Sequence, residues 1–412
     1  MKEHSQRYGF LESVVLSMAA LGIYNCVIQF LLYPALNRRL GTEVFGEILT
    51  LLSIQTVPVI SAGAGVNYAR MANVPHFKAE NGDYNRCLLV CFGLIASVSV
   101  GTLCIRGTTY AVSFILYPVL GIVTALRYYA SVAFRLEINY RKNFVFYILL
   151  SVGYLLGMLV FRLTSLWETA LLAGEVLAVF YVLCTSPVLR RPYLKTSPHA
   201  HTVYRSCGAL VFSQIFCYLT LNADRLLIGS LRSGTEVTIF YTASLLGKAM
   251  AMLTEPIAGV AIGYLARSKG FGRKQFLLCS GAGVFAGLAA CAVFVPLSPF
   301  LIGILYPDIA ADAAPYFLIA NSGQILYFVA NLLLVILLRF TKEKYQLYIN
   351  IVYCAAFFAA CIPALLHDGL SAFCKVVLLL NIARLAAVLL LGILKSPKDV
   401  SIGTQVNTIK RT

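Results

Sequence analysis

The apolar segment 238–266 carries two charged side chains that could act on a charged substrate. Tyr241, Lys248 and Glu255 follow one another at intervals of seven residues, which places them on one face of a helix. Lys248 lies about 15 Å along that helix, near mid-bilayer, where a charged group is costly and a functional candidate by default. We interpret Lys248 as a cation for an anionic substrate and Glu255, which precedes Pro256, as a titratable carboxylate for ion coupling. The alternative is a structural ion pair with neighbouring helices.

Other polar side chains inside apolar segments extend this candidate site. Asn321, Gln324 and Asn331 recur at helical spacing and predict a polar stripe that lines water. The remaining candidates for substrate binding are Arg127, Arg225, Asn25, Gln29 and Gln214, and those for ion coupling are Asp224 and Glu175. Hydrogen bonds between helices and snorkelling arginines are the alternatives. Lys375 and Arg384 lie on opposite faces of one helix, so one of them would face a cavity and the other an interface.

The sequence shows no motif of an enzyme or a metal site. It has no Gly-rich phosphate loop, no paired catalytic carboxylates in a polar loop and no Ser/His/Asp set. Cys87 and Cys91 lie one helical turn apart, but no histidine or acidic cluster joins them, so we interpret the twelve cysteines as small apolar filler. We expect no catalytic residue, no metal and no bound cofactor.

Long apolar runs carry all of these candidates. Hydrophobic residues make up 59% of the 412 residues and charged residues 12%, about half the usual share in soluble proteins. A run of about 20 apolar residues crosses the hydrocarbon as a helix, because every backbone polar group must be satisfied within the segment. The predicted fold class is an all-α polytopic membrane protein with about twelve transmembrane helices. The predicted spans are 13–36, 44–66, 87–105, 109–133, 144–162, 167–186, 207–228, 238–266, 276–297, 315–338, 347–366 and 370–394.

The basic residues are distributed unequally between the two sets of loops. Most of the 33 Lys and Arg fall in the termini and in the loops that share their side of the membrane. The opposite loops hold Arg38, Arg39, Arg106, Arg162 and Arg232. By the positive-inside rule both termini are predicted to be cytoplasmic. The formal net charge of +16 then reflects loops that face anionic lipid headgroups, and we expect no nucleic-acid partner.

A short repeat suggests that the spans form two halves. The tetrapeptide Gly-Thr-Glu-Val occurs at 41–44 and again at 234–237, each time after an odd-numbered span and at the start of the next. This equivalence predicts two six-helix lobes. We therefore expect an N-lobe at 1–190, a basic cytoplasmic linker at 191–206, a C-lobe at 207–394 and a cytoplasmic tail at 395–412.

The stretch 39–46 reads Arg-Leu-Gly-Thr-Glu-Val-Phe-Gly at the start of the second span, and the second repeat at 234–237 lies between Asp224 and Tyr241. These segments resemble the polysaccharide flippases of the multidrug/oligosaccharidyl-lipid/polysaccharide (MOP) exporter superfamily, of the O-antigen or repeat-unit (Wzx) type. The first stretch resembles the family's R-x-L-G-x-x-x-F-G entry to the second span. Asp224, the Leu-Ile-Gly of 227–229, the repeat at 234–237 and Tyr241 resemble the D-x-x-[IL]-[IL]-G…G-x-x-x-x-G-x-Y stretch. Thr238 and Ile239 depart from the family's usual Val-Gly at this turn.

The resemblance implies a MATE-like fold whose two lobes open alternately to each side of the bacterial inner membrane. It also implies a substrate, an undecaprenyl-diphosphate-linked oligosaccharide repeat unit for O-antigen, capsule or exopolysaccharide, moved from the inner to the outer leaflet. Family members are coupled to a proton or sodium gradient, and the implied partners are membrane lipids and other polysaccharide assembly proteins. The alternatives are a drug/cation antiporter of the same superfamily, which would prefer acidic groups in its cavity, and an integral polysaccharide polymerase or acyltransferase.

Overall fold

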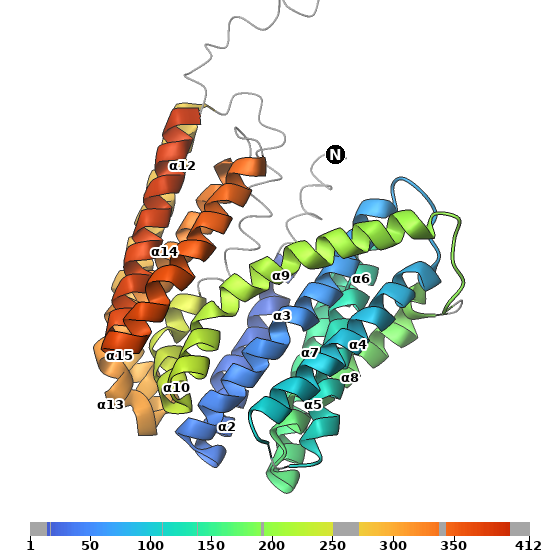
Figure 1. Ribbon diagram of the computed structural model, residues 1–412, viewed down its shortest axis with the longest axis horizontal. Coiled ribbons are helices and arrows are strands. Elements are labelled where there is room, and N and C mark those ends of the chain that lie inside the picture. The colour runs from blue at the N-terminus through green and yellow to red at the C-terminus, as the bar shows by residue number, and fades with distance from the viewer. Residues whose placement is uncertain are drawn as a thin grey trace, which may run out of the picture. The chain divides into compact units, whose positions relative to one another are not determined.

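The computed structural model describes residues 15–16, 18–108, 110–137, 139–190, 193–249, 272–337 and 343–395, and within these ranges every regular element is a helix (Figure 1). The chain forms two compact units, Met1–Val237 and Thr238–Thr412. The first unit is longer than the predicted N-lobe because it includes the helix Ala200–Leu231. The lobe boundaries drawn from the repeat stay a prediction.

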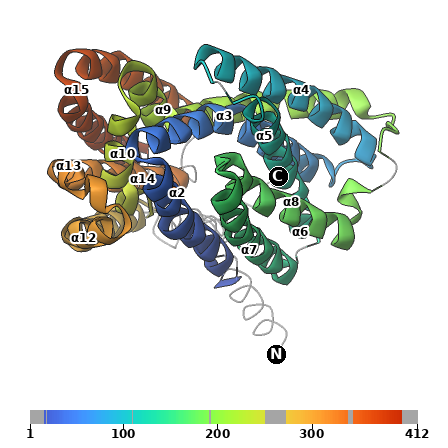
Figure 2. The same cartoon turned by 90° about the horizontal axis from the view of Figure 1, so that it is seen from below.

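Unit 1 is a bundle of long helices joined by short turns. Residues 18–26 are helical and continue without a break into η1, a segment of π-helix. The elements are η1 (Val27–Leu32), α2 (Tyr33–Leu40), α3 (Thr42–Asn73), α4 (Asn81–Ile105), α5 (Ser113–Ala130), α6 (Val132–Leu136), α7 (Tyr140–Thr164), α8 (Trp167–Thr185), η2 (Pro187–Leu189), α9 (Ala200–Leu231) and the start of α10 (Gly234–Ala243). Helices α7 and α8 lie side by side (Figure 2).

Unit 2 contains the rest of α10 and three long helices that pack on one another. Its further elements are α12 (Arg273–Leu305), η3 (Pro307–Ile309), α13 (Ala310–Ala313), η4 (Ala314–Tyr316), α14 (Phe317–Leu337) and α15 (Glu343–Lys395). Helix α14 packs against both α12 and α15. Phe276, Val329, Leu333 and Val388 form part of the hydrophobic core between these three helices.

Ten of the described helical segments are long and apolar enough to cross a membrane. The longest of them, Tyr348–Lys395, has 48 residues, whereas about 20 suffice for one crossing. Gly369 has φ 71° and ψ −158°, which interrupts the helix between the predicted spans 347–366 and 370–394. Most of the predicted span 238–266 falls in 250–271, outside the described residues. The count of twelve and the cytoplasmic termini stay predictions.

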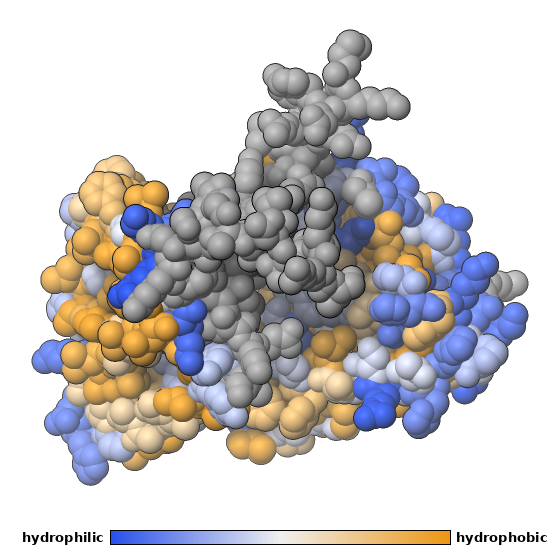
Figure 3. Space-filling view, turned by 90° about the horizontal axis from the view of Figure 1, so that it is seen from above, coloured by the Kyte–Doolittle hydropathy of each residue, from blue (hydrophilic) through white to orange (hydrophobic). Residues whose placement is uncertain are grey.

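Helix α12 of unit 2 exposes large apolar side chains. On α12 the side chains of Leu278, Phe285 and Phe300 are 75%, 74% and 65% exposed. Figure 3 shows apolar side chains over much of the surface of this unit. A water-soluble protein rarely exposes so continuous an apolar patch. The exposed apolar helices and the membrane-length spans together show a multi-pass membrane protein.

The predicted linker packs against the first turns of α4. Asn85 Nδ2 donates to the Tyr193 carbonyl at 2.9 Å, and Arg86 Nη2 donates to the Leu194 carbonyl at 3.1 Å. The buried carboxylate of Asp83 accepts from the Ser197 amide at 3.0 Å. Three side chains of one helix end therefore fix residues 193–197 to unit 1.

The two copies of the repeat meet at two glycines in unit 1. A Cβ added to Gly46, in the second turn of α3, would lie 1.7 Å from the Gly234 carbonyl oxygen. A Cβ added to Gly234 would lie 2.2 Å from the Glu43 carbonyl oxygen. Small residues allow helix backbones in a membrane to approach this closely. The repeated sequence thus corresponds to two helix starts packed directly on each other.

Gly46→Ala should lower the thermal stability of the purified protein in detergent, because overpacking of this kind costs about 1–3 kcal/mol. Gly101→Ala is the matched control, since a Cβ at Gly101 would meet nothing within 4 Å. Thermal unfolding followed by circular dichroism measures both variants. Equal unfolding temperatures for the two would contradict the close contact.

Candidate functional site

A buried ion pair joins α5 and α8 in unit 1. Arg127 Nε donates to Glu175 Oε2, and both side chains are almost completely shielded from solvent. Tyr154 of α7 donates its hydroxyl to Glu175 Oε1 at 2.7 Å, so both carboxylate oxygens are bonded. The sequence predicted Arg127 as a substrate cation and Glu175 as a coupling carboxylate, and the structure places them in direct contact.

Tyrosines surround the guanidinium of this pair. Arg127 Cζ lies 4.1 Å from the ring centre of Tyr128 and 5.9 Å from that of Tyr24. The rings of Tyr24 and Tyr154 are 6.0 Å apart. Aromatic faces stabilise a cation where water cannot, by about 0.5–2 kcal/mol each. The pair is therefore stabilised by the Tyr154 hydroxyl on the carboxylate and by two aromatic rings near the guanidinium.

Small residues and one amide position the members of this cluster. A Cβ on Gly153 would lie 2.5 Å from the Cα of Gly174, so α7 and α8 approach closely beside Tyr154 and Glu175. Asn67 of α3 donates from Nδ2 to the Tyr128 carbonyl at 2.9 Å, which ties the end of α5 to α3. The cluster is thus positioned by two helix contacts, α7 with α8 and α3 with α5, and the Arg127–Glu175 pair carries no net charge while it is closed.

The other candidates of unit 1 are dispersed over the first span and α9. Asn25 donates from Nδ2 to the Leu21 carbonyl at 2.8 Å, within its own helix. Gln29 lies in η1, and its buried Oε1 has no hydrogen-bond partner among the described residues. Short π-helical segments are frequent at functional sites. Substrate binding by Gln29 therefore stays a prediction. Gln214 is half-buried on α9.

Asp224 and Arg225 are adjacent on α9. Asp224 is buried, and its Oδ1 accepts from the backbone amide of Arg225 at 2.8 Å. Arg225 is half-buried. Asp224 is thus a buried carboxylate of unit 1 in addition to Glu175.

In unit 2 the predicted polar stripe divides into packing and site residues. Asn321 is fully buried, accepts from the Gly247 amide at 2.7 Å and donates to Ser298 Oγ at 3.1 Å and the Phe317 carbonyl at 2.9 Å. These bonds use both ends of its amide to hold α12, α14 and the Gly247 segment together. Gln324, one turn later, is half-buried.

Lys248 directly follows Gly247, whose amide is bound by Asn321. It is half-buried, and its Nζ is 5.5 Å from the ring centre of Phe240. Glu255, its proposed companion on the same helix face, falls within 250–271 and lies outside the described residues. The cation role of Lys248 and the coupling role of Glu255 stay predictions.

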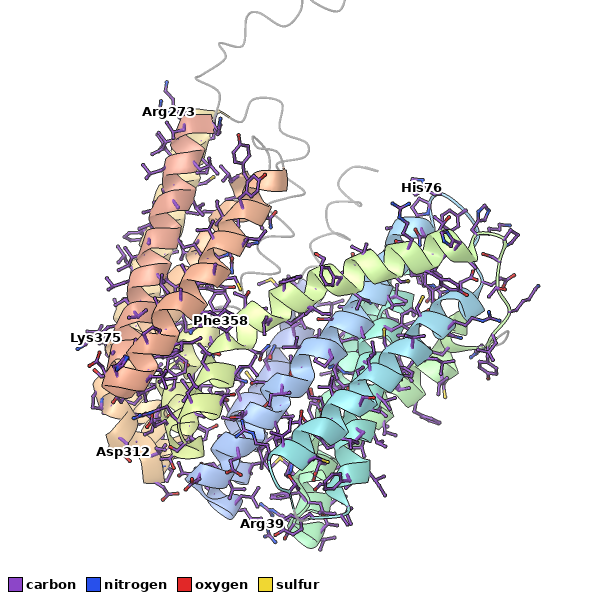
Figure 4. All side chains as sticks on the ribbon, viewed as in Figure 1. Arg39, His76, Arg273, Asp312, Phe358 and Lys375 are labelled. Atoms are coloured by element: carbon purple, nitrogen blue, oxygen red, sulfur yellow. The ribbon has the colours of Figure 1, made fainter. Side chains whose placement is uncertain are left out.

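Asn331 instead contacts Arg384, which the sequence predicted to face a cavity or an interface but which was not among the predicted binding residues. Its Oδ1 accepts from Arg384 Nη2 at 2.7 Å, and Asn350 accepts from the same nitrogen at 2.9 Å. Arg384 is buried on α15, whereas Lys375 on the same helix is exposed and projects away from the other helices (Figure 4). The presence of Arg384, Asn381 and several asparagines and tyrosines in neighbouring spans is the signal that could have identified this cluster.

Glu168 is a second residue that the predicted site did not include. It is fully buried in the first turn of α8, seven residues before Glu175 and hence on the same helix face. No lysine or arginine in the described part of the chain forms an ion pair with it. A carboxylate directly after Trp167 resembles an ordinary polar helix start, so only its burial reveals it.

Comparisons with known proteins find similarity in structure alone. No protein-family model matches the sequence, and no curated protein matches it. Among solved structures, an inward-facing multidrug resistance MATE family transporter of the MOP superfamily aligns with a TM-score of 0.63 and 11% identity, over 92% of this chain and 94% of that one. The lipid II flippase MurJ, in an inward closed conformation, aligns with a TM-score of 0.69 and 10% identity, over 93% of this chain and 86% of that one.

A MOP superfamily transporter from Pyrococcus furiosus, described as having a binding pocket of reversed polarity, aligns with a TM-score of 0.61 and 14% identity, over 93% and 95% of the two chains. At such low identities these similarities show the fold and no more. The predicted MATE-like fold is thereby confirmed.

Replacing Arg127 or Glu175 alone by Met should destabilise the protein by about 3–5 kcal/mol, because the remaining partner is a buried, unpaired charge. The double substitution should recover most of that loss. Thermal unfolding of the two single variants and the double variant measures the coupling.

The exposed Lys142–Glu137 pair, with an N···O distance of 2.9 Å, is the control. Lys142→Met should change stability by no more than about 1 kcal/mol. Additive effects of the Arg127 and Glu175 substitutions would show that the two groups do not form a pair.

Proposed function

We propose, on the premise of the MATE-like fold, that this membrane protein is a flippase for an anionic, lipid-linked oligosaccharide. Its substrate would be an undecaprenyl-diphosphate-linked repeat unit of a surface polysaccharide, moved from the inner to the outer leaflet of the bacterial inner membrane by alternating access. A proton or sodium gradient would drive the cycle. Other polysaccharide assembly proteins would supply the substrate and remove the product.

The charge of unit 2 is the observation that carries this proposal. Among the described residues of this unit, Arg384 is the one charged side chain that is buried. Its described acidic side chains, Asp308, Asp312 and Asp368, are all exposed. Within the described part of unit 2 the buried cation has no buried acid beside it, and this favours an anionic substrate because a cationic one would be repelled. A diphosphate headgroup carries such an anionic charge.

The polar groups around the buried cation suit a sugar headgroup as well. Amide and phenol side chains both donate and accept hydrogen bonds, as hydroxyl-rich ligands require. Asn331, Asn350, Tyr327 and Tyr353 surround Arg384, and Gln324 lies on the same helix as Asn331. The combination of cation, amide and aromatic ring supports a phosphorylated glycan over an apolar drug.

The second candidate function is a drug/cation antiporter, and the buried carboxylates of unit 1 favour it. Glu168, Glu175 and Asp224 are all buried there, and Glu168 has no ion-pair partner in the part of the chain that the structure describes. A multidrug resistance MATE transporter is among the structural neighbours. In such an antiporter these carboxylates would bind a proton and a cationic drug in alternation.

The proposed coupling step is the opening of the Arg127–Glu175 pair. Protonation of Glu175 would remove the carboxylate charge and leave Arg127 as a net cation inside the membrane. A change of net charge from zero to +1 at a buried site shifts the affinity for an anion by a large factor. Uptake of one proton could thus change how strongly unit 1 attracts the substrate phosphates.

The wild-type gene should restore surface polysaccharide in a bacterial strain that lacks its own repeat-unit flippase, and Lys248→Ala should abolish that rescue at unchanged protein level. Lys375→Ala, which alters an exposed lysine, should leave rescue intact. Immunoblots of surface glycan measure the outcome. Efflux of cationic drugs without glycan rescue would instead establish the antiporter.

Glu175→Gln keeps the shape of the side chain and removes its ability to titrate, so it should flatten the dependence of export on the proton gradient. Export measured in cells treated with graded uncoupler tests this expectation. If export by the variant falls with uncoupler concentration as steeply as export by the wild type, Glu175 does not couple transport. Glu255→Gln is then the next variant to test.

A further inference from the structure

Arg384 is a buried cation that lacks a counter-ion within the described residues. Its relative exposure is 6%, and it lies on the second arm of α15, after the interruption at Gly369. None of the ion pairs of the described chain involves it. An arginine side chain does not lose its proton in proteins, so the charge persists at any physiological pH. A buried persistent charge requires compensation from an opposite charge, from hydrogen bonds or from a ligand.

The guanidinium of Arg384 is held by two hydrogen bonds, but not all of its N–H donors have an acceptor among the described residues. Both acceptor contacts, from Asn331 Oδ1 at 2.7 Å and Asn350 Oδ1 at 2.9 Å, engage the same nitrogen, Nη2. Nε and Nη1 are buried and have no hydrogen-bond partner among the described residues. Because a guanidinium has five N–H groups, three of them, one on Nε and two on Nη1, remain without an acceptor.

Two aromatic rings cover the guanidinium. Arg384 Cζ lies 4.5 Å from the ring centre of Tyr327 on α14 and 4.5 Å from that of Tyr353 on α15. Stacking of this kind leaves the edge of the guanidinium as the direction in which a ligand can bind. The unbonded N–H groups lie in that same plane.

The amide of Asn381 fixes the position of Tyr353, one of the two rings beside the guanidinium. Tyr353 donates its hydroxyl to Asn381 Oδ1 at 2.9 Å, and Asn381 donates from Nδ2 to the Gly323 carbonyl at 2.9 Å. Asn381 is buried and precedes Arg384 by one helical turn. The arrangement connects both arms of α15 to α14 and orders the site before any ligand arrives, which lowers the entropic cost of binding.

We infer that Arg384, with Asn331, Asn350, Tyr327 and Tyr353, forms a binding site for a phosphate-type oxyanion in unit 2. Three free N–H donors on two nitrogens suit an anion with several oxygens better than a single-atom anion. Charge-assisted N–H···O bonds to phosphate are among the strongest hydrogen bonds of proteins. On the proposed function, from which this last step follows, the site contacts the diphosphate of the lipid-linked substrate.

The site can be tested with purified full-length protein in detergent. Thermal unfolding is followed with added sodium pyrophosphate, farnesyl diphosphate or farnesol, and with sodium chloride at matched ionic strength. Pyrophosphate and farnesyl diphosphate should stabilise the wild type, and Arg384→Gln should weaken their apparent affinity at least tenfold. Lys375→Gln, on the same helix but exposed, should bind like the wild type.

Arg384→Lys covers the case in which the glutamine variant fails to fold. It keeps the charge but loses the planar donors and the ring stacking, so binding should be weakened although the protein folds. Stabilisation of Arg384→Lys equal to that of the wild type would overturn the site, as would an equal effect of chloride alone. Stabilisation by farnesyl diphosphate and not by pyrophosphate would identify a lipid phosphate as the ligand, and the reverse would identify a free phosphate.

The outcomes separate this site from the proposed function. Binding of pyrophosphate through Arg384 in a protein that rescues no polysaccharide export would uphold the oxyanion site and remove the flippase assignment. Rescue of export by a protein whose diphosphate binding does not depend on Arg384 would overturn the site and leave the assignment standing.

Discussion

The cost of placing a charged side chain in a hydrocarbon environment governs the arrangement of this protein. Every buried charge must find an opposite charge, a set of hydrogen bonds or a ligand. Arg127 meets this requirement internally through Glu175 and the tyrosines around them. Among the described residues, Arg384 meets it only in part, through two asparagines and two aromatic rings. The difference separates an ion pair that is neutral while closed from a cation that keeps unbonded N–H donors within the described chain.

The same constraint explains how the helices pack. In a hydrocarbon environment apolar side chains such as Phe285 can stay exposed. Burial of apolar surface therefore does not decide which helices pack together. Small residues and buried amides take over that task. Gly46 and Gly234 let two helix starts touch through their backbones, and Asn321 joins three segments of unit 2 with one side chain. The polar interior of the protein is therefore both its structural framework and the location of its candidate sites.

Apolar runs and turn residues made the helices predictable from sequence, while contacts between helices were not. The helical segment Tyr348–Lys395 has 48 residues, too many for a single crossing of the bilayer, so two spans were predicted there. The interruption at Gly369 falls between them. The pairing of Arg127 with Glu175 joins helices distant in sequence, and no periodicity within either one encodes it. Asn321 satisfied the helical spacing of a water-lining stripe, yet its amide is used in packing. Which N–H groups of Arg384 lack an acceptor depends on which side chains of other helices lie beside it. The spacing of residues along the sequence does not contain that information.

We propose that the chain moves an anionic lipid-linked glycan across a bilayer. The most direct test of this proposal is a flipping assay in proteoliposomes that contain a fluorescent polyprenyl-diphosphate-linked oligosaccharide, with an impermeant lectin or glycosidase to report the glycans in the outer leaflet. We predict that reconstituted protein makes the inner-leaflet glycans accessible at a rate well above that of protein-free liposomes. An accessible fraction that stays at the protein-free level, in liposomes where the same protein accumulates a cationic drug, would contradict the account.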